Sequence, residues 1–234
     1  MATTEKILQL KQDFDDVYEA GYNKGIAQGG GGSSQVDLFP YMTGAPVFQS
    51  ADLTDITEDI TLHFDRTQSL ASAFSGAKFS CKKLTVYISE ICTNLFRAFR
   101  LGSGLEEFEI IGTTSQITNY SATFAGRQTL KRIIGNFDFS SATNVGDMLS
   151  SCDALEEFYP VANTIKISIS FANCPNLIPE SRQAIFDGLA TVETAQTLTL
   201  HKNLKILQSQ VDSANAKGWT IAGGTVVSEE EYYG

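Results

Sequence analysis

Side chains able to carry out catalysis are scarce in this sequence of 234 residues. It has two histidines, His63 and His201, and a Ser-His-Asp or Cys-His arrangement would have to use one of them. Both are flanked by strand-like residues, and the Gly-x-Ser-x-Gly turn that presents a nucleophilic serine in many hydrolases is absent from the sequence. We therefore expect no catalytic residues and a protein that is not an enzyme.

A cluster of carboxylates is the other group that could do chemistry. Asp52, Asp55, Glu58 and Asp59 lie within eight positions, and a glycosidase needs two acids several ångströms apart. Such a cluster is more often a solvated edge, and its spacing matches no EF-hand loop. We expect a solvated edge here, and the sequence leaves open whether this edge binds an ion.

The four cysteines do not form a metal-binding pattern. Cys81, Cys92, Cys152 and Cys174 include no Cys-x-x-Cys pair and no histidine at zinc-finger spacing. Cys152 and Cys174 occupy the same place in two successive repeats, so a disulfide between them is one interpretation, but reduced core thiols are the expected state. The short glycine pairs of the chain lack the lysine of a phosphate-binding loop, and we expect neither a metal nor a cofactor.

Composition limits the partners. The formal charge of −10 and the isoelectric point near 4.7 argue against nucleic acid, whose binding depends on clustered Lys and Arg. The sequence has no apolar run of about 18 to 20 residues, so membrane insertion is not expected. The first nine residues lack the pattern of a secretory signal, which predicts a chain that is made in the cytoplasm and stays there until something other than the general secretion route releases it.

The beginning of the chain reads as an anchoring helix on a linker. Residues 1–28 carry a stripe of apolar residues at steps of three and four, namely Ile7, Leu10, Phe14 and Val17. A short helix of this kind is marginal alone, so it either associates with copies of itself as a short coiled coil or docks on another protein. Residues 29–35, rich in Gly and Ser, form the linker.

A recurring phrase then dominates the sequence at a period of about 25 residues. The copies are Ala98-Phe99 before Leu105, Thr123-Phe124 before Leu130, Met148-Leu149 before Leu155, and Phe171-Ala172 before Leu177. An earlier copy at Phe74 reaches its Leu84 only after ten residues, which suggests an insertion of about four residues near Phe79. A fixed period of this length predicts a solenoid, with strands of a parallel ladder in the apolar runs after each Leu, at 108–111, 133–134 and 165–169.

The expected fold class is therefore α/β, with a central solenoid between two ends. We expect N-terminal cap strands over 36–69, repeats over 70–178, a C-terminal α/β cap over 179–223 and a solvated acidic tail over 224–234. Pro179 is suited to the start of a helix that runs to Thr191, a strand is expected over 197–200, and a second helix over 204–216.

The repeat phrase resembles the BspA-like class of leucine-rich repeats, whose coils are built on Ala-Phe-x-x-Cys-x-x-Leu followed by a strand. Phe171-Ala172-Asn173-Cys174-Pro175-Asn176-Leu177 carries the resemblance most fully, and Ala216-Lys217-Gly218-Trp219-Thr220 looks like the cap of such proteins in gut Firmicutes and their prophages. Gly102 and Arg127 depart from the pattern, because each stands where the class has Cys. The resemblance implies a leucine-rich-repeat solenoid with a parallel β ladder.

The resemblance also implies a binding role, because members of the class are mainly bacterial surface adhesins or parts of phage particles. The helix on its glycine linker favours a virion protein, such as a tail fibre, baseplate or capsid fibre component, over a bacterial surface adhesin or an intracellular interaction module. Its partners would be other virion subunits, other copies of the chain in a homo-oligomer, and a host cell-surface protein or glycan. The expected binding surface includes Tyr87, Tyr120 and Tyr159, with Phe137 and Tyr232 as further candidates.

Overall fold

The computed structural model describes residues 35–38, 48–64 and 67–233. These residues form a mixed α/β structure in which the strands pair in parallel sheets and helices are few. The expected N-terminal helix with Ile7, Leu10, Phe14 and Val17, and nearly all of the expected linker, lie outside the described residues.

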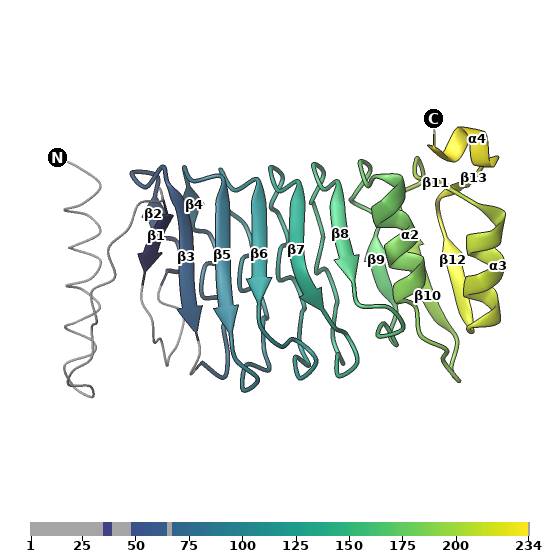
Figure 1. The fold of residues 1–234 in the computed structure, drawn as a ribbon, viewed down its shortest axis with the longest axis horizontal. Coiled ribbons are helices and arrows are strands. Elements are labelled where there is room, and N and C mark those ends of the chain that lie inside the picture. The colour runs from purple at the N-terminus through teal and green to yellow at the C-terminus, as the bar shows by residue number, and fades with distance from the viewer. Residues whose placement is uncertain (1–34, 39–47, 65–66, 234) are drawn as a thin grey trace.

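The main element is a six-stranded parallel sheet in the order β1-β3-β5-β6-β7-β8 (Figure 1). Its strands are β1 (Gln35–Leu38), β3 (Asp59–Phe64), β5 (Lys83–Ile88), β6 (Glu107–Ile111), β7 (Arg132–Phe137) and β8 (Glu157–Pro160). A smaller pair, β2 (Asp52–Leu53) and β4 (Lys78–Phe79), is also parallel. From β3 onward each strand pairs with the strand 24 or 25 residues further along the chain, so equivalent side chains come to lie side by side.

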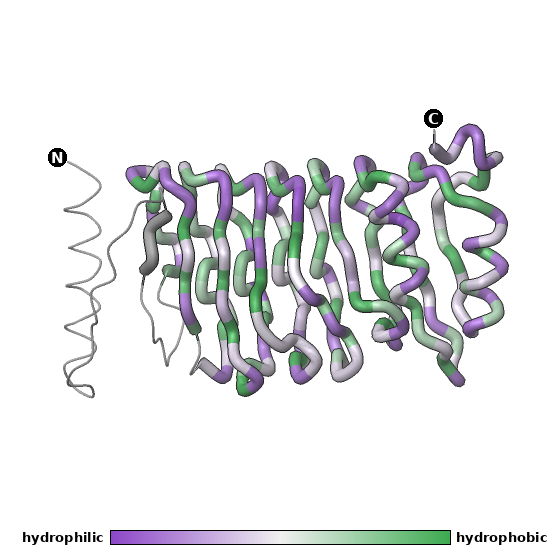
Figure 2. Tube along the Cα trace, in the orientation of Figure 1, coloured by the Kyte–Doolittle hydropathy of each residue, from purple (hydrophilic) through white to green (hydrophobic). Residues whose placement is uncertain are grey.

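The core is built from columns of equivalent apolar residues, which appear in Figure 2 as hydrophobic stretches recurring from strand to strand. One column holds Phe48, Phe74, Phe99 and Phe124, whose rings stack at centroid distances of 4.7, 5.3 and 5.8 Å. All four rings are buried, as the repeat phrase predicts for the last three. Phe48 and β3 continue the columns into the stretch predicted as an N-terminal cap.

The strand register corrects the expected insertion near Phe79. Leu84 lies opposite Phe108, not opposite Leu105. Counting back three residues from this pair places Cys81 opposite Leu105, and Cys81 is fully buried. The first copy is therefore longer than the others by one residue rather than by about four, and a cysteine takes the place of the leucine, since both residue types fill buried apolar sites.

The six-stranded sheet ends at β8, where a helix replaces the next strand. Helix α2 (Pro179–Gly188) begins at Pro179, as predicted, and packs along β8 (Figure 1). The Ser181 hydroxyl accepts a hydrogen bond from the Phe158 N–H at 2.9 Å and donates one to the Phe158 carbonyl at 3.0 Å. This side chain thus satisfies backbone groups that an edge strand would leave unpaired.

Beyond β8 the chain forms a second parallel sheet. Its order is β12-β10-β9, with β9 (Ile169–Phe171), β10 (Gln196–Leu200) and β12 (Trp219–Ala222). Helix α3 (Gln208–Ala216) packs on β12, and β11 (Lys205–Ile206) pairs with β13 (Thr225–Val226). The last element is the short helix α4 (Glu229–Tyr233).

Several predicted boundaries shift in this region. The strand expected at 165–169 is replaced by β9 further along, and Ile165 makes only an isolated bridge to Leu189. The first predicted helix ends at Gly188 rather than Thr191, and the second begins at Gln208 rather than 204, because 205–206 pair as β11. The strand at 197–200 is confirmed within β10.

The turns that return the chain from one strand to the next repeat as faithfully as the strands. Ser72, Arg97, Ala122 and Asp147 all have positive φ, between 53° and 60°, at equivalent places in four successive turns. Backbone hydrogen bonds link these turns at the same offset, for example from Ser72 N–H to Phe96 O and from Arg97 N–H to Ser121 O. The periodic backbone therefore holds residues in a left-handed conformation that glycine would adopt more easily.

Candidate functional site

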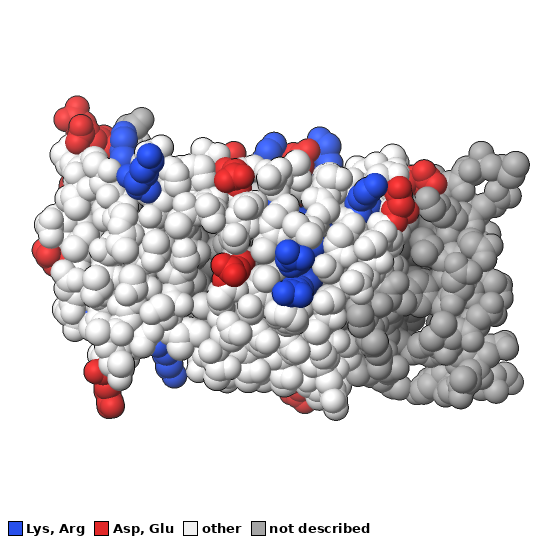
Figure 3. Space-filling view, turned by 180° about the vertical axis from the view of Figure 1, so that it is seen from behind, with Lys and Arg blue, Asp and Glu red and all other residues white. Residues whose placement is uncertain are grey.

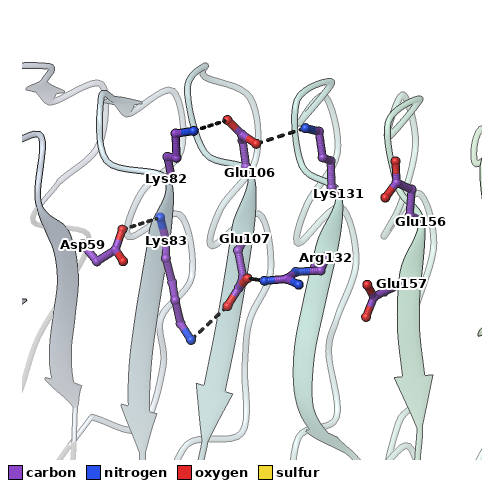
Figure 4. A pocket seen from close by; sticks show the side chains of 9 residues that line it. All are labelled: Asp59, Lys82, Lys83, Glu106, Glu107, Lys131, Arg132, Glu156 and Glu157. Atoms are coloured by element: carbon purple, nitrogen blue, oxygen red, sulfur yellow. Dashed lines mark hydrogen bonds and ion pairs between the residues drawn. The ribbon is translucent and has the colours of Figure 1, made fainter.

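Charged side chains gather in two rows across the six-stranded sheet, at the starts of its strands (Figure 4). The Lys82 row consists of Lys82, Glu106, Lys131 and Glu156. The Lys83 row consists of Asp59, Lys83, Glu107, Arg132 and Glu157. Because the strands are in register, each row takes one residue from each successive unit, and the sign of the charge alternates along both rows.

The Lys82 row is held by ion pairs on both sides of one carboxylate. Glu106 lies 3.0 Å from the Lys131 ammonium and 3.7 Å from the Lys82 ammonium. The hydrogen bond and charge of Lys131, with a smaller contribution from Lys82, lower the pKa of the Glu106 carboxyl. The same hydrogen bond and charge of Glu106 raise the pKa of Lys131. Both groups are therefore fixed in their charged forms at neutral pH.

The Lys83 row repeats this arrangement with a less exposed centre. Glu107 pairs with Lys83 at 2.9 Å and with Arg132 on its other side. Lys83 also pairs with Glu109 at 2.9 Å, and its backbone N–H donates to Asp59 at 3.1 Å. Glu107 as a whole is only 8% exposed, so this carboxylate is shielded by its neighbours while both its cationic partners reach the surface.

The two rows line an open groove of about 510 Å³ with five carboxylates and four cations. The excess negative charge is at the β8 end, where Arg132 turns toward Glu107 in Figure 4 and away from Glu157. Glu157 accepts a hydrogen bond from the Tyr159 hydroxyl at 3.5 Å, and the pKa of Tyr159 is raised by burial and by Glu157 and Glu180. The arrangement can recognise charged groups on a partner.

Two of the three tyrosines predicted to form a binding surface, Tyr87 and Tyr159, reach the surface of the sheet. Tyr159 is 37% exposed on the outer side of β8. Tyr87 is half-buried and stacks on His63 across β3 and β5, with ring centroids 4.3 Å apart. Both side chains point to the same side of the sheet as the charged rows, because strand residues two apart share a face.

Tyr120 does not belong to this surface. Its ring is fully buried against Phe139, and its hydroxyl lies 3.2 Å from the Thr114 carbonyl and 3.1 Å from the Asp138 carbonyl. The prediction was wrong because Tyr120 follows Asn119 in the turn, at the column that Leu70 and Leu95 fill in earlier units. Phe137 and Tyr232, the further candidates, are also buried.

The acidic cluster of 52–59 is divided by the fold. Asp59 joins the Lys83 row, whereas Asp52 lies in β2 and accepts a hydrogen bond from the Thr54 hydroxyl at 2.5 Å. Over residues 48–64 and 67–233, no group of three or more His, Cys, Asp or Glu side chains is placed to hold a metal ion.

The four cysteines are buried and free of disulfides. Burial raises the pKa of Cys81 and of Cys152 to about 12, so these thiols stay protonated and unreactive. The Cys152 thiol donates to the Phe124 carbonyl at 3.2 Å. Reduced core thiols, the expected state, are confirmed.

Arg127 and Gly102, the two residues that stand where the repeat pattern has Cys, lie next to each other in the structure. Arg127 Nε donates to the Phe99 carbonyl at 2.6 Å, which is the same offset of 28 residues as the bond from Cys152 to Phe124. Its Nη1 donates to the Ala77 carbonyl at 3.2 Å and its Nη2 to the Phe74 carbonyl at 3.4 Å. A Cβ on Gly102 would collide first with the Ala77 carbonyl oxygen and would also lie 2.8 Å from Nη1, so the missing side chain makes room for both this carbonyl and the guanidinium bonded to it.

Sequence reasoning missed the charged rows, although a signal was present. The doublets Lys82-Lys83, Glu106-Glu107, Lys131-Arg132 and Glu156-Glu157 each follow directly after the column of Cys81, Leu105, Leu130 and Leu155, and their sign alternates. A charge map drawn at the repeat period would have found them. The side opposite the strands looks different, because Figure 3 shows few charged side chains over its central part.

No helix within the described part of the chain is long and apolar enough to cross a membrane. Comparisons with models of protein families, with curated proteins and with solved structures find no match to this chain.

Proposed function

We propose that this chain is a non-enzymatic display protein, in which a leucine-rich-repeat solenoid of the BspA-like type presents the outer face of the six-stranded sheet to a partner. The observation that carries the proposal is the pair of charged rows, which extend over successive units in one register. A surface of this kind grows with the number of units and suits an extended partner.

The chemistry of this face supports binding. Its four cations are ion-paired with Glu106 and Glu107, and the pKa shifts of Glu106 and Lys131 favour their charged forms. A general acid or base at neutral pH needs the opposite kind of shift, toward the operating pH. Tyr159 adds an exposed aromatic side chain next to the rows, which is a common anchor in protein and glycan recognition.

The proposed setting is a phage virion, as a tail fibre, baseplate or capsid fibre component. This part rests on the resemblance of the repeats and on the apolar stripe of residues 1–28 followed by its glycine-rich linker. The stripe would anchor the chain to other virion subunits or to copies of itself, and the repeats would contact a protein or glycan on the host surface. Many weak contacts displayed together would give strong attachment.

The test is attachment of the fluorescently labelled full chain to intact Firmicutes cells. We expect saturable binding that weakens as salt rises from 0.05 to about 0.5 M, because exposed charges are screened at high ionic strength. Tyr159→Ala should weaken attachment several-fold. Tyr233→Ala is the matched control, since Tyr233 is 67% exposed but lies at the far end of the chain in α4.

Two results would count against the proposal. Equal attachment of the Tyr159→Ala and unsubstituted chains would show that this face of the sheet does not contact the cell surface. Turnover of a cell-wall polysaccharide that is lost in the Asp55→Asn, Asp59→Asn chain would instead revive an enzymatic function.

A further inference from the structure

The last described residues form a strap that pairs with β11 through β13, accepts a hydrogen bond from Lys205 at the Glu231 carbonyl, and buries one side chain, Tyr232. Residues 223–233 are exposed or half-exposed, apart from Tyr232, which is 2% exposed. The acidic residues Glu229, Glu230 and Glu231 are exposed, as expected of a solvated tail, whereas the Tyr232 side chain is docked in the cap. Gly223 and Gly224, with φ of 81° and 70°, lie where the strap leaves β12.

The pocket around Tyr232 is made of polar groups from both helices of the cap. The Tyr232 hydroxyl donates to the Pro179 carbonyl at 2.9 Å and accepts from Gln210 Nε2 at 3.0 Å. Arg182 lies over the ring at 4.6 Å from its centroid, and its Nη2 donates to the Tyr232 carbonyl at 3.3 Å. The pocket therefore contacts the ring, the hydroxyl and the backbone carbonyl of one tyrosine.

These polar groups depend on the strap. Arg182 and Gln210 are 8% and 4% exposed, so both are more than nine-tenths buried. Arg182 Nε already has no acceptor among the described residues, and Nη1 donates only to the Leu177 carbonyl. Removing Tyr232 would leave the buried Arg182 guanidinium and the Gln210 amide without these hydrogen-bond partners. This cost favours occupation of the pocket by another tyrosine that lies in a similar sequence.

We propose that this pocket is a recognition site for an acidic, tyrosine-bearing segment, and that its second occupant is the strap, residues 225–233, of another copy of the chain. Besides the Tyr232 pocket, the strap joins the cap through the two-residue strand β13 and through single hydrogen bonds from Thr225 Oγ1 to the Lys202 carbonyl and from Lys205 Nζ to the Glu231 carbonyl. An exchange has to break these contacts and leaves β10 and β12 intact. Exchange of an identical element between copies is a low-cost route to association. The proposal does not depend on the proposed function.

The experiment uses the full chain with Tyr232→Ala, whose pocket is empty, and a fluorescent peptide of residues 225–233. We expect saturable binding followed by fluorescence anisotropy. Tyr232→Ala in the peptide should weaken binding at least tenfold, and Tyr232→Phe about fivefold through loss of the hydroxyl bonds. Tyr233→Ala in the peptide is the matched control and should change binding less than twofold. Equal binding of the three substituted peptides and the native peptide would overturn the proposal.

The second copy is tested by capture between full chains. An immobilised Tyr232→Ala chain should retain the unsubstituted chain several-fold more than it retains a second Tyr232→Ala chain. Association through residues 1–28 would contribute equally to both, so equal retention would overturn the exchange.

A further readout covers failure of the Tyr232→Ala chain to fold. In the unsubstituted chain, amide hydrogens of residues 229–233 should exchange at least tenfold faster than those of β10, and in the Tyr232→Phe chain faster still, with β10 unchanged. Exchange of the strap at the same rate as β10 would show that it is part of the cap core and would overturn the proposal.

Discussion

The repeat units and the C-terminal cap each bury an arginine, and they satisfy it by different means. Arg127 donates to three backbone carbonyls that belong to the two units before it. Arg182 donates to Leu177 in its own neighbourhood and to Tyr232, 50 residues later and next to the end of the chain. In the repeats the acceptors are supplied by the periodic backbone, whereas in the cap one acceptor is supplied by a strap.

The same contrast appears in the backbone. The turns of the repeats hold Ser72, Arg97, Ala122 and Asp147 at positive φ, whereas from residue 165 to residue 233 the residues with positive φ are Gly218, Gly223 and Gly224. Each left-handed residue other than glycine costs about 1–2 kcal/mol, which the surrounding ladder must offset. The repeats therefore hold strained backbone that their ladder must offset, whereas the cap places its left-handed positions at glycines.

The largest expected effect comes from Arg127→Ala. This change leaves the carbonyls of Phe74, Ala77 and Phe99 short of donors and opens a cavity, so we expect a loss of about 3–5 kcal/mol of unfolding free energy. Chemical denaturation measures it. The control is Arg132→Ala, whose side chain is 47% exposed and should cost no more than about 1 kcal/mol.

Arg182→Ala tests the other side of the comparison. We expect a loss of about 2 kcal/mol, and about 1 kcal/mol for Tyr232→Phe, in the same denaturation assay. Because both changes act on one pocket, the double variant should lose less than the sum. A strap variant as costly as Arg127→Ala would break the distinction between the two regions.

Asp147→Gly should stabilise the chain by about 0.5–1 kcal/mol, since glycine adopts the φ of 55° found there without strain. The matched change in the cap is Asp212→Gly, within α3, which should destabilise by about the same amount. Thermal unfolding would compare the two. A loss of stability in both variants would refute the idea that the repeat turns carry strain.

The smallest effect is on the titration of Glu106. Because Lys131 lowers the pKa of this carboxyl, its ion pair stabilises the fold above the pKa of the unfolded chain and is lost as pH falls through the lower folded value. NMR titration of the carboxyl carbon should show a raised pKa for Glu106 in Lys131→Met.

Much of the architecture followed from residue spacing. The phenylalanine column, the strands after Leu105 and Leu130, and the helix start at Pro179 were all readable, because each depends on apolar periodicity or on a local backbone preference. The extension of the phenylalanine column to Phe48 could not be predicted, since Phe48 is not followed by a leucine at the spacing of the other copies.

The candidate site was much less predictable. The alternation of charge along the two rows exists only once the strand register brings residues 24 or 25 apart into contact. Tyr120 looked like a surface aromatic because its neighbours are polar, but the turn directs the ring into the core. The docking of Tyr232 depends on contacts with residues 22 to 53 positions away, which no local pattern encodes.

The reach of Arg127 over two earlier units limits how the chain can grow by duplication. A copied segment of 24 or 25 residues would keep the central strands and turns in register, because most backbone hydrogen bonds between those units use that offset. A breakpoint between Ala77 and Arg127, however, would place a new unit under the guanidinium, and any side chain at the position of Gly102 would collide with it. The bonds of Arg127 therefore join residues 74–127 into one structural block, and we expect a duplicated unit to be accommodated more readily outside it.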